Sequence, residues 1–132
     1  MSRRELREQI FKLLFRVEFN ELDEMQEQND LFFEENEFEI KPENESYISE
    51  KTKKIIDKLK DIDDAINKEA KGWTTDRMGK VDLTILRLAV YEIRYDEDVP
   101  TSVAINEAVE LAKKFGRDES AGFVNGVLAK FA

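Results

Sequence analysis

The chain has 132 residues, is 41% hydrophobic and 39% charged, and carries a formal net charge of −9 at pH 7. This length and apolar content predict a single folded domain, residues 1–132, with a buried core. Because the chain has no His and no Cys, it lacks the commonest general base, the thiol nucleophile and the usual zinc ligands. We therefore expect neither an enzyme nor a cofactor or metal site. Without a signal peptide or an apolar run of about 18 residues, we expect a cytoplasmic protein with no membrane contact.

The charge changes sign along the chain. Residues 1–16 carry five basic and two acidic side chains, whereas residues 17–50 carry thirteen acids and a single lysine. Exposed charges further apart than about 10 Å are largely screened from each other at 0.1 M salt. A basic patch near the N-terminus can therefore attract a polyanion even in an acidic protein. The acidic segment itself is interpreted as a solvated surface.

The first expected helix starts at the N-terminus, where Ser2 and Glu5 match a capping box. Arg3 and Arg4 fall in its first turn, where the helix dipole disfavours each positive charge by about a few tenths of a kcal/mol. A local mismatch without compensation indicates a functional role. Apolar side chains at helical spacing predict the core face of this helix, which comprises Leu6, Ile10, Leu13, Leu14 and Val17.

A second flank of this helix carries Arg4 and Arg7 together with Phe11 and Phe15. In one interpretation the arginines are solvated, and these phenylalanines pack in the core with Phe19. In the other, the flank binds single-stranded RNA, because arginines contact phosphates and aromatic rings stack on unpaired bases. The residues themselves leave both interpretations open.

The middle of the chain also has helical patterns. Residues 22–35 predict a short acidic helix, and a connection containing Phe38 follows it. A long helix is expected from Asn44, and Asp61 is placed to cap a new short helix. The lysines of this region are interpreted as a solvated face.

A central helix is predicted between Val81 and Tyr95. The segment is apolar almost all round, so we expect it to be buried in the middle of the domain. Trp73, in the turn before it, is expected to anchor the core, and Asp82 lies near the helix start, where a negative charge is favoured. The expected polar stripe of this helix consists of Thr84, Arg87, Tyr91 and Arg94.

Residues 99–131 predict two more helices joined by a tight turn. Gly116 is expected to end the first helix in the left-handed conformation, and Asp118 to cap the second. Gly122 and Gly126 lie inside the second helix and cost about 1 kcal/mol each relative to alanine. These glycines therefore predict a close approach by a neighbouring backbone.

At these residues the chain resembles a known family. The runs VPTSVAINEAVELAKKFG and SAGFVNGVLAKF resemble the C-terminal hallmark of the NusB family of bacterial transcription antitermination factors, and VDLTILRLAVYEI is similar to the family's central helix. The resemblance covers the whole chain, although residues 20–70 contribute little to it. The helical periodicity predicts an all-α fold of about seven helices in two packed halves, and the resemblance implies that each half is a small helical bundle.

The resemblance also implies a function. It implies binding of the single-stranded boxA element in ribosomal RNA transcripts, with NusE, a small-subunit ribosomal protein, as partner. The pair would help RNA polymerase in an antitermination complex to pass terminators. Carried over position by position, the resemblance implies RNA-binding roles for Arg3, Arg4, Arg7, Phe15, Asp82, Phe115, Glu119 and Phe123.

The sequence departs from the family pattern at two points, and it leaves alternatives open for the roles of some residues and for the function. Glu5 and Glu8 interrupt the basic run, which predicts weak RNA binding by the protein alone, and Phe15 lacks the hydroxyl that a tyrosine would supply. Phe115 and Phe123 also lie on expected core faces, so a purely structural role is an alternative for both. The alternative function is an interaction module that binds only protein, and the free protein is expected as either a monomer or a homodimer.

Overall fold

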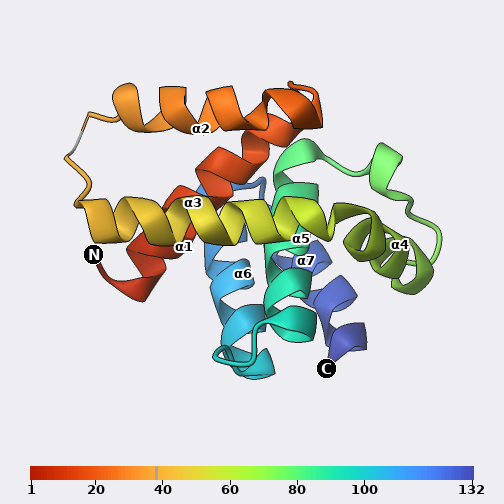
Figure 1. Cartoon of the computed structure of the whole chain (residues 1–132). Helices are drawn as coiled ribbons and strands as arrows, with labels where there is room; N and C mark the ends of the chain where they lie inside the picture. The colour runs from red at the N-terminus through yellow and green to blue at the C-terminus, as the bar shows by residue number, and fades with distance from the viewer. Residues whose placement is uncertain (38) are drawn as a thin grey trace. The chain divides into compact units, whose positions relative to one another are not determined.

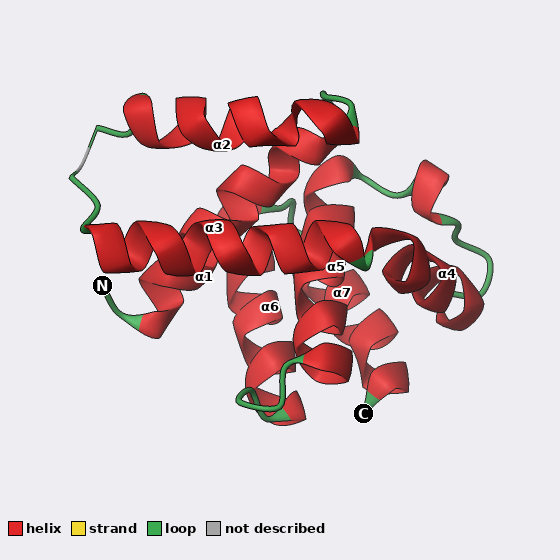
Figure 2. Cartoon of the chain, viewed as in Figure 1, coloured by secondary structure: helices red, strands yellow, loops and turns green. Residues whose placement is uncertain are grey.

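The computed structural model of the chain describes residues 1–37 and 39–132. Within this part the chain forms seven α-helices and four short 3-10 turns, with no β-strand (Figure 2). The predicted all-helical fold with about seven helices is therefore confirmed. The helices fall into two compact units, Met1–Asp57 and Lys58–Ala132, hereafter unit 1 and unit 2. In the described residues, no helix combines the length and the apolar character needed to cross a membrane.

Unit 1 contains three helices, α1 (Arg3–Phe15), α2 (Met25–Glu34) and α3 (Pro42–Asp57). Two 3-10 turns, Arg16–Glu18 and Leu22–Glu24, connect α1 to α2. Helix α1 packs across α3, and α2 contacts α1 (Figure 1). Phe38, which was predicted to lie in the connection before α3, is outside the described residues.

The predicted capping box at the start of α1 is present. The Glu5 N–H donates to Ser2 Oγ at 3.1 Å, and the Ser2 N–H donates to Glu5 Oε1 at 3.0 Å. Phe11 is 4% exposed, so its core interpretation is confirmed. Phe19 is 62% exposed, so the same interpretation was wrong there. The reason is that Phe19 follows the turn Arg16–Glu18 and no longer continues the buried face of α1.

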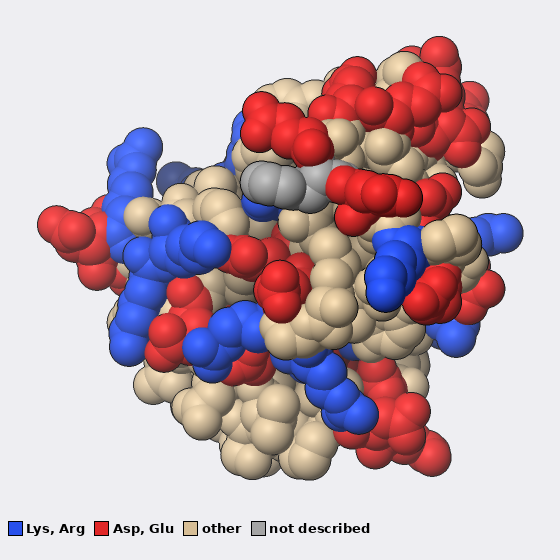
Figure 3. Space-filling view, turned by 90° about the vertical axis from the view of Figure 1, so that its left-hand side faces the viewer, with Lys and Arg blue, Asp and Glu red and all other residues tan. Residues whose placement is uncertain are grey.

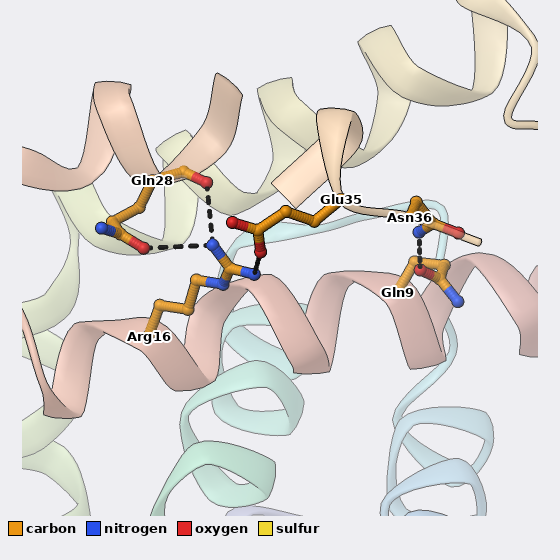
Figure 4. A network of polar contacts seen from close by, with 5 residues as sticks. All are labelled: Gln9, Arg16, Gln28, Glu35 and Asn36. Atoms are coloured by element: carbon orange, nitrogen blue, oxygen red, sulfur yellow. Dashed lines mark hydrogen bonds and ion pairs between the residues drawn. The ribbon is translucent and has the colours of Figure 1, made fainter. Parts of the chain in front are cut away.

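Arg16, just after α1, makes polar contacts with residues in and just after α2 (Figure 4). Its guanidinium donates to the backbone oxygen of Gln28 at 3.4 Å and to the side-chain Oε1 of Gln28 at 3.1 Å. It also pairs with Glu35 at 3.3 Å and lies 5.3 Å from the centre of the Phe32 ring. Helix α2 is acidic and buries few apolar side chains, namely Met25 and Phe32. The polar contacts of Arg16 therefore add to the weak hydrophobic packing of this helix.

Unit 2 contains α4 (Leu59–Glu69), α5 (Lys80–Tyr95), α6 (Thr101–Phe115) and α7 (Ser120–Leu128). Helix α5 lies beside α6 and α7, and α6 packs on α7 (Figure 1). All residues from 83 to 92 are buried, so the prediction of a buried central helix is confirmed.

Three members of the polar stripe predicted for α5 are buried, contrary to expectation. Thr84 is 1% exposed, and its hydroxyl donates to the Lys80 carbonyl at 2.8 Å. Arg87 is 8% exposed and pairs with Asp63 of α4. Tyr91 is also 8% exposed. Thr84 and Arg87 are tolerated in the interior because each keeps a polar partner. Tyr91 is tolerated because most of its buried surface is an aromatic ring.

Several predicted helix ends were wrong. Helix α4 begins at Leu59, two residues before the predicted cap Asp61, because Lys58 already leaves helical geometry with φ −104° and ψ 8°. Gly116 ends α6 in an extended conformation, with φ −91° and ψ −170°, and not in the left-handed one. Asp118 does not cap α7; instead the Arg117 N–H donates to Ser120 Oγ at 2.9 Å.

The glycines of α7 also differ from the prediction. Gly122 and Gly126 are exposed, and a Cβ built at either position meets no described atom within 4 Å beyond the adjoining residues and the nearby backbone of α7 itself. The expected close approach of a neighbouring backbone is therefore absent from the described chain. At Gly116, by contrast, a Cβ would lie 2.5 Å from Ser120 Cβ and 2.7 Å from the Ala112 carbonyl oxygen. Close packing thus requires glycine at position 116.

Candidate functional site

The predicted site residues of unit 1 all belong to α1. Arg3 and Arg4 are exposed in its first turn, which the capping box between Ser2 and Glu5 holds in place. Two exposed positive charges therefore lie at the N-terminal end of the helix, against the preference of its dipole. Arg7, one turn further on, is only 8% exposed and has interactions within the chain. Arg3 and Arg4 are therefore the more accessible of the three arginines.

Phe15 belongs to a row of three phenylalanine rings at the other end of α1. The ring centre of Phe15 lies 6.2 Å from that of Phe11 and 5.3 Å from that of Phe19, the latter in an edge-to-face arrangement. Exposure increases along the row, because Phe11 is buried, Phe15 is half-buried and Phe19 is 62% exposed. Twelve residues of helix separate Phe15 from Arg3, or about 18 Å. The charged and aromatic parts of this flank are therefore well separated.

The acidic residues of unit 1 gather around α2. On the face shown in Figure 3, acidic side chains crowd the upper edge, where α2 lies. The helix and the turn before it expose Glu21, Asp23, Glu24, Glu27 and Asp30. An RNA strand is repelled from such a surface, so the first turn of α1 is the part of unit 1 best suited to a phosphate.

The predicted site residues of unit 2 all line one pocket. Asp82, Phe115, Glu119 and Phe123 come from α5, α6, the turn after α6, and α7, and the structure brings them together around a cavity of about 780 Å³. We call this the unit 2 pocket. Its volume falls within the range of about 300–1,000 Å³ that is typical of ligand sites. Both phenylalanines are half-buried and line the pocket, so they contribute to packing and remain available to a ligand.

The turn between α6 and α7 sets the spacing of the two phenylalanines. Ser120 is 2% exposed and accepts the hydrogen bond from the Arg117 N–H, while the Gly116 N–H donates to the Ala112 carbonyl at 2.9 Å. These contacts fix the short connection that carries Glu119. The pocket wall is therefore formed by a well-fixed turn and two helix ends.

Sequence reasoning missed further residues of the pocket, of which Trp73 is the largest. Trp73 was expected in the core, but it is 54% exposed, and its ring meets the Phe123 ring edge-to-face at 5.8 Å. One signal could have located it: Trp73 stands beside Gly72 in a turn, and not at a position of a helical apolar repeat. Lys80 and Arg117 also line the pocket and balance the charges of its two carboxylates.

The lining of the pocket suits binding. It combines aromatic rings with charged side chains of both signs. Among the described residues, no three acidic side chains are grouped as a metal ion would require.

Comparison with known proteins agrees with the resemblance of the sequence. The model of the NusB family matches residues 4–132. The transcription antitermination protein NusB of Agathobacter rectalis is 54% identical over 132 residues, which cover 100% of both chains.

Solved structures agree with this relationship. The T. maritima NusB structure superposes with a TM-score of 0.88 at 32% identity and covers 100% of this chain and 91% of its own. A chain from a complex of the antitermination factors NusB and NusE with double-stranded RNA gives a TM-score of 0.84 at 26% identity, with 98% of this chain and 94% of that chain covered. The chain therefore belongs to the NusB family of transcription antitermination proteins, which are not enzymes.

Proposed function

We propose that the protein is a cytoplasmic antitermination factor that binds single-stranded, boxA-type RNA together with NusE. In this function the bound RNA is part of a ribosomal RNA transcript, and the assembly helps RNA polymerase to pass terminators. The observation that carries the proposal is the convergence of Asp82, Phe115, Glu119 and Phe123 on the unit 2 pocket. Asp82 lies more than 30 residues before the other three in the sequence, and a purely structural role would not require all four to line one cavity.

Two further observations support RNA as the ligand. Arg3 and Arg4 are exposed in the first turn of a helix, where positive charges oppose the dipole and can meet a phosphate. The related NusB and NusE chains were solved in a complex with double-stranded RNA, so RNA and NusE are known ligands of a protein that shares this fold.

The proposal also gives the candidate residues of each unit a role. The arginines of α1 supply phosphate contacts, and the aromatic side chains Phe15, Phe115 and Phe123 supply stacking surfaces. The two accessible arginines, Arg3 and Arg4, release few counterions, so a single-stranded ligand should show a slope of about −1.4 in a plot of log K against log[salt]. We therefore expect weak binding by the protein alone and tighter binding when NusE adds its own contacts.

Fluorescence anisotropy of a labelled boxA-type single strand tests the proposal, with and without NusE and over a series of salt concentrations. The expected result is weak, salt-dependent binding by the protein alone and a clear gain in affinity with NusE. A scrambled RNA of the same length is the control for sequence preference. Binding of NusE with no RNA affinity at any salt concentration would instead support an interaction module that recognises only protein.

A further inference from the structure

We infer that Trp73 is the stacking platform for one unpaired RNA base in the unit 2 pocket. The inference rests on the RNA-binding function proposed above and adds a residue and a ligand group to it. The indole is 54% exposed although tryptophan is among the most apolar side chains of the unit. It lines the unit 2 pocket together with Phe115 and Phe123.

The ring is held by its neighbours in a defined position. Its contact with Phe123 is edge-to-face, with ring centres 5.8 Å apart and an angle of 70° between the planes. In this geometry the edge of one ring meets the face of the other, so the two rings do not cover each other as stacked rings would. Trp73 therefore keeps aromatic surface available for a second planar group.

The turn that carries Trp73 is fixed on both sides. Gly72 takes φ +84°, which glycine adopts without strain, and the Trp73 N–H donates to the Ala70 carbonyl at 2.9 Å. On the other side, the Thr75 N–H donates to Asn67 Oδ1 at 2.7 Å. A side chain that is already ordered loses little conformational entropy when it binds, which favours stacking on a ligand.

The charges of the pocket favour a base over a phosphate. Lys80 and Arg117 bring two positive charges to its lining, and Asp82 and Glu119 bring two negative ones. The formal charge is balanced, so a neutral planar group fits between the aromatic walls better than a phosphate does. A base in a duplex is stacked on both faces, whereas an unpaired base has a face available for stacking on an aromatic side chain. The pocket should therefore distinguish single-stranded from double-stranded RNA.

The intrinsic fluorescence of Trp73 tests the inference directly, because it is the only tryptophan of the chain. The fluorescence of the wild-type protein is titrated with the boxA-type single strand and, separately, with the same strand annealed to its complement. Anisotropy of the labelled RNA records binding in parallel. We expect the single strand to quench Trp73 along the same curve as the anisotropy, whereas the duplex should change the anisotropy without quenching.

Three variants separate stacking from other effects. Trp73→Ala should weaken single-strand binding by about 5- to 150-fold, the range for loss of one base–aromatic stack, and Trp73→Phe should recover most of it. Tyr95→Ala is the matched control, because Tyr95 is an exposed aromatic residue of the same unit, at 40%, outside the pocket lining. It should bind as the wild type does. Thermal melts verify that each variant is folded.

The outcomes distinguish this inference from the function on which it rests. RNA binding without any change in Trp73 fluorescence, or with undiminished affinity in Trp73→Ala, would overturn the inference and leave the proposed function intact. Equal quenching by single strand and duplex would overturn the selectivity for an unpaired base. Absence of RNA binding with and without NusE would overturn both, and quenching by NusE alone would assign the pocket to a protein side chain.

Discussion

Arg87 and Asp63 form a two-point ion pair that ties α5 to α4. Nε and Nη2 of the guanidinium each donate to one carboxylate oxygen of Asp63, both at 2.8 Å. The side chain of Arg87 is 10% exposed and that of Asp63 is 23% exposed, so the pair is largely shielded from water. It explains how a charged residue can lie within the most buried helix of unit 2.

Asp63→Ala should destabilise the protein by about 3 kcal/mol, because it leaves the Arg87 charge buried without its carboxylate. This value is near the lower end for buried pairs, since Asp63 keeps some contact with solvent. Urea denaturation measures the effect as a lower midpoint. Asp64→Ala is the control, because Asp64 pairs at 3.1 Å with the exposed Lys60 one turn away. It should have a far smaller effect, and equal losses in the two variants would contradict the assignment.

Two glycine positions should respond in opposite directions to the same substitution. Gly116→Ala places a Cβ 2.5 Å from Ser120 Cβ, so the turn must shift, and we expect a loss of about 1–3 kcal/mol. Gly126→Ala meets open space inside α7 and should stabilise the protein by about 0.5–1 kcal/mol through helix propensity. Denaturation midpoints of both variants decide the matter. A gain of stability in Gly116→Ala would show that the turn is not close-packed.

Two features that depend on near neighbours in the sequence were predicted well, although several helix ends were not. The capping box of Ser2 and Glu5 involves residues three positions apart, and the apolar repeat of α5 is continuous over its length. Gly116 is needed because of the Ser120 side chain, which is only four residues further on but is placed by the turn. The buried ion pair of Arg87 was not predicted, because its partner Asp63 lies 24 residues away.

Only part of the candidate site could be predicted from the sequence. Asp82, Phe115, Glu119 and Phe123 were chosen by resemblance. The expected turn places the last three near one another, but nothing in the sequence indicated that Asp82 would line the same pocket. Trp73 was missed because the apolar character of a side chain does not say whether it is buried or faces a ligand. Only the folded positions of α5, α6 and α7 bring these residues together.

The capping box predicts a pH dependence at the start of α1. The Ser2 backbone N–H, followed by the Ser2 hydroxyl, lowers the pKa of Glu5 below its ordinary value of 4.5. A lowered pKa means that the stabilisation is complete above the unfolded value and is lost as the pH falls through the folded one. NMR titration of the Glu5 carboxyl should therefore show a midpoint below 4.5 in the wild type and a higher one in Ser2→Ala. Identical midpoints would contradict the capping box.

The RNA surface of unit 1 can be tested at Arg3 and Arg4. Changing both to glutamate should leave the fold intact, because both side chains are exposed, and acids suit the first turn of a helix better than arginines. The thermal melting temperature should be unchanged or slightly higher. RNA binding should be lost, because two phosphate contacts become repulsions, and the salt slope should fall by about 1.4. Binding of NusE in the absence of RNA should change little if NusE contacts another surface.

The matched control is the double variant Lys53→Glu, Lys54→Glu. These lysines are also adjacent and exposed in unit 1, but they lie on α3 and outside the proposed site, so the variant has the same net charge as the arginine variant. If repulsion by total charge alone governed affinity, both variants would lose RNA equally. We expect the lysine variant to bind RNA with a modest loss and an unchanged salt slope. Undiminished RNA binding by a folded arginine variant would show that the first turn of α1 does not contact the phosphates.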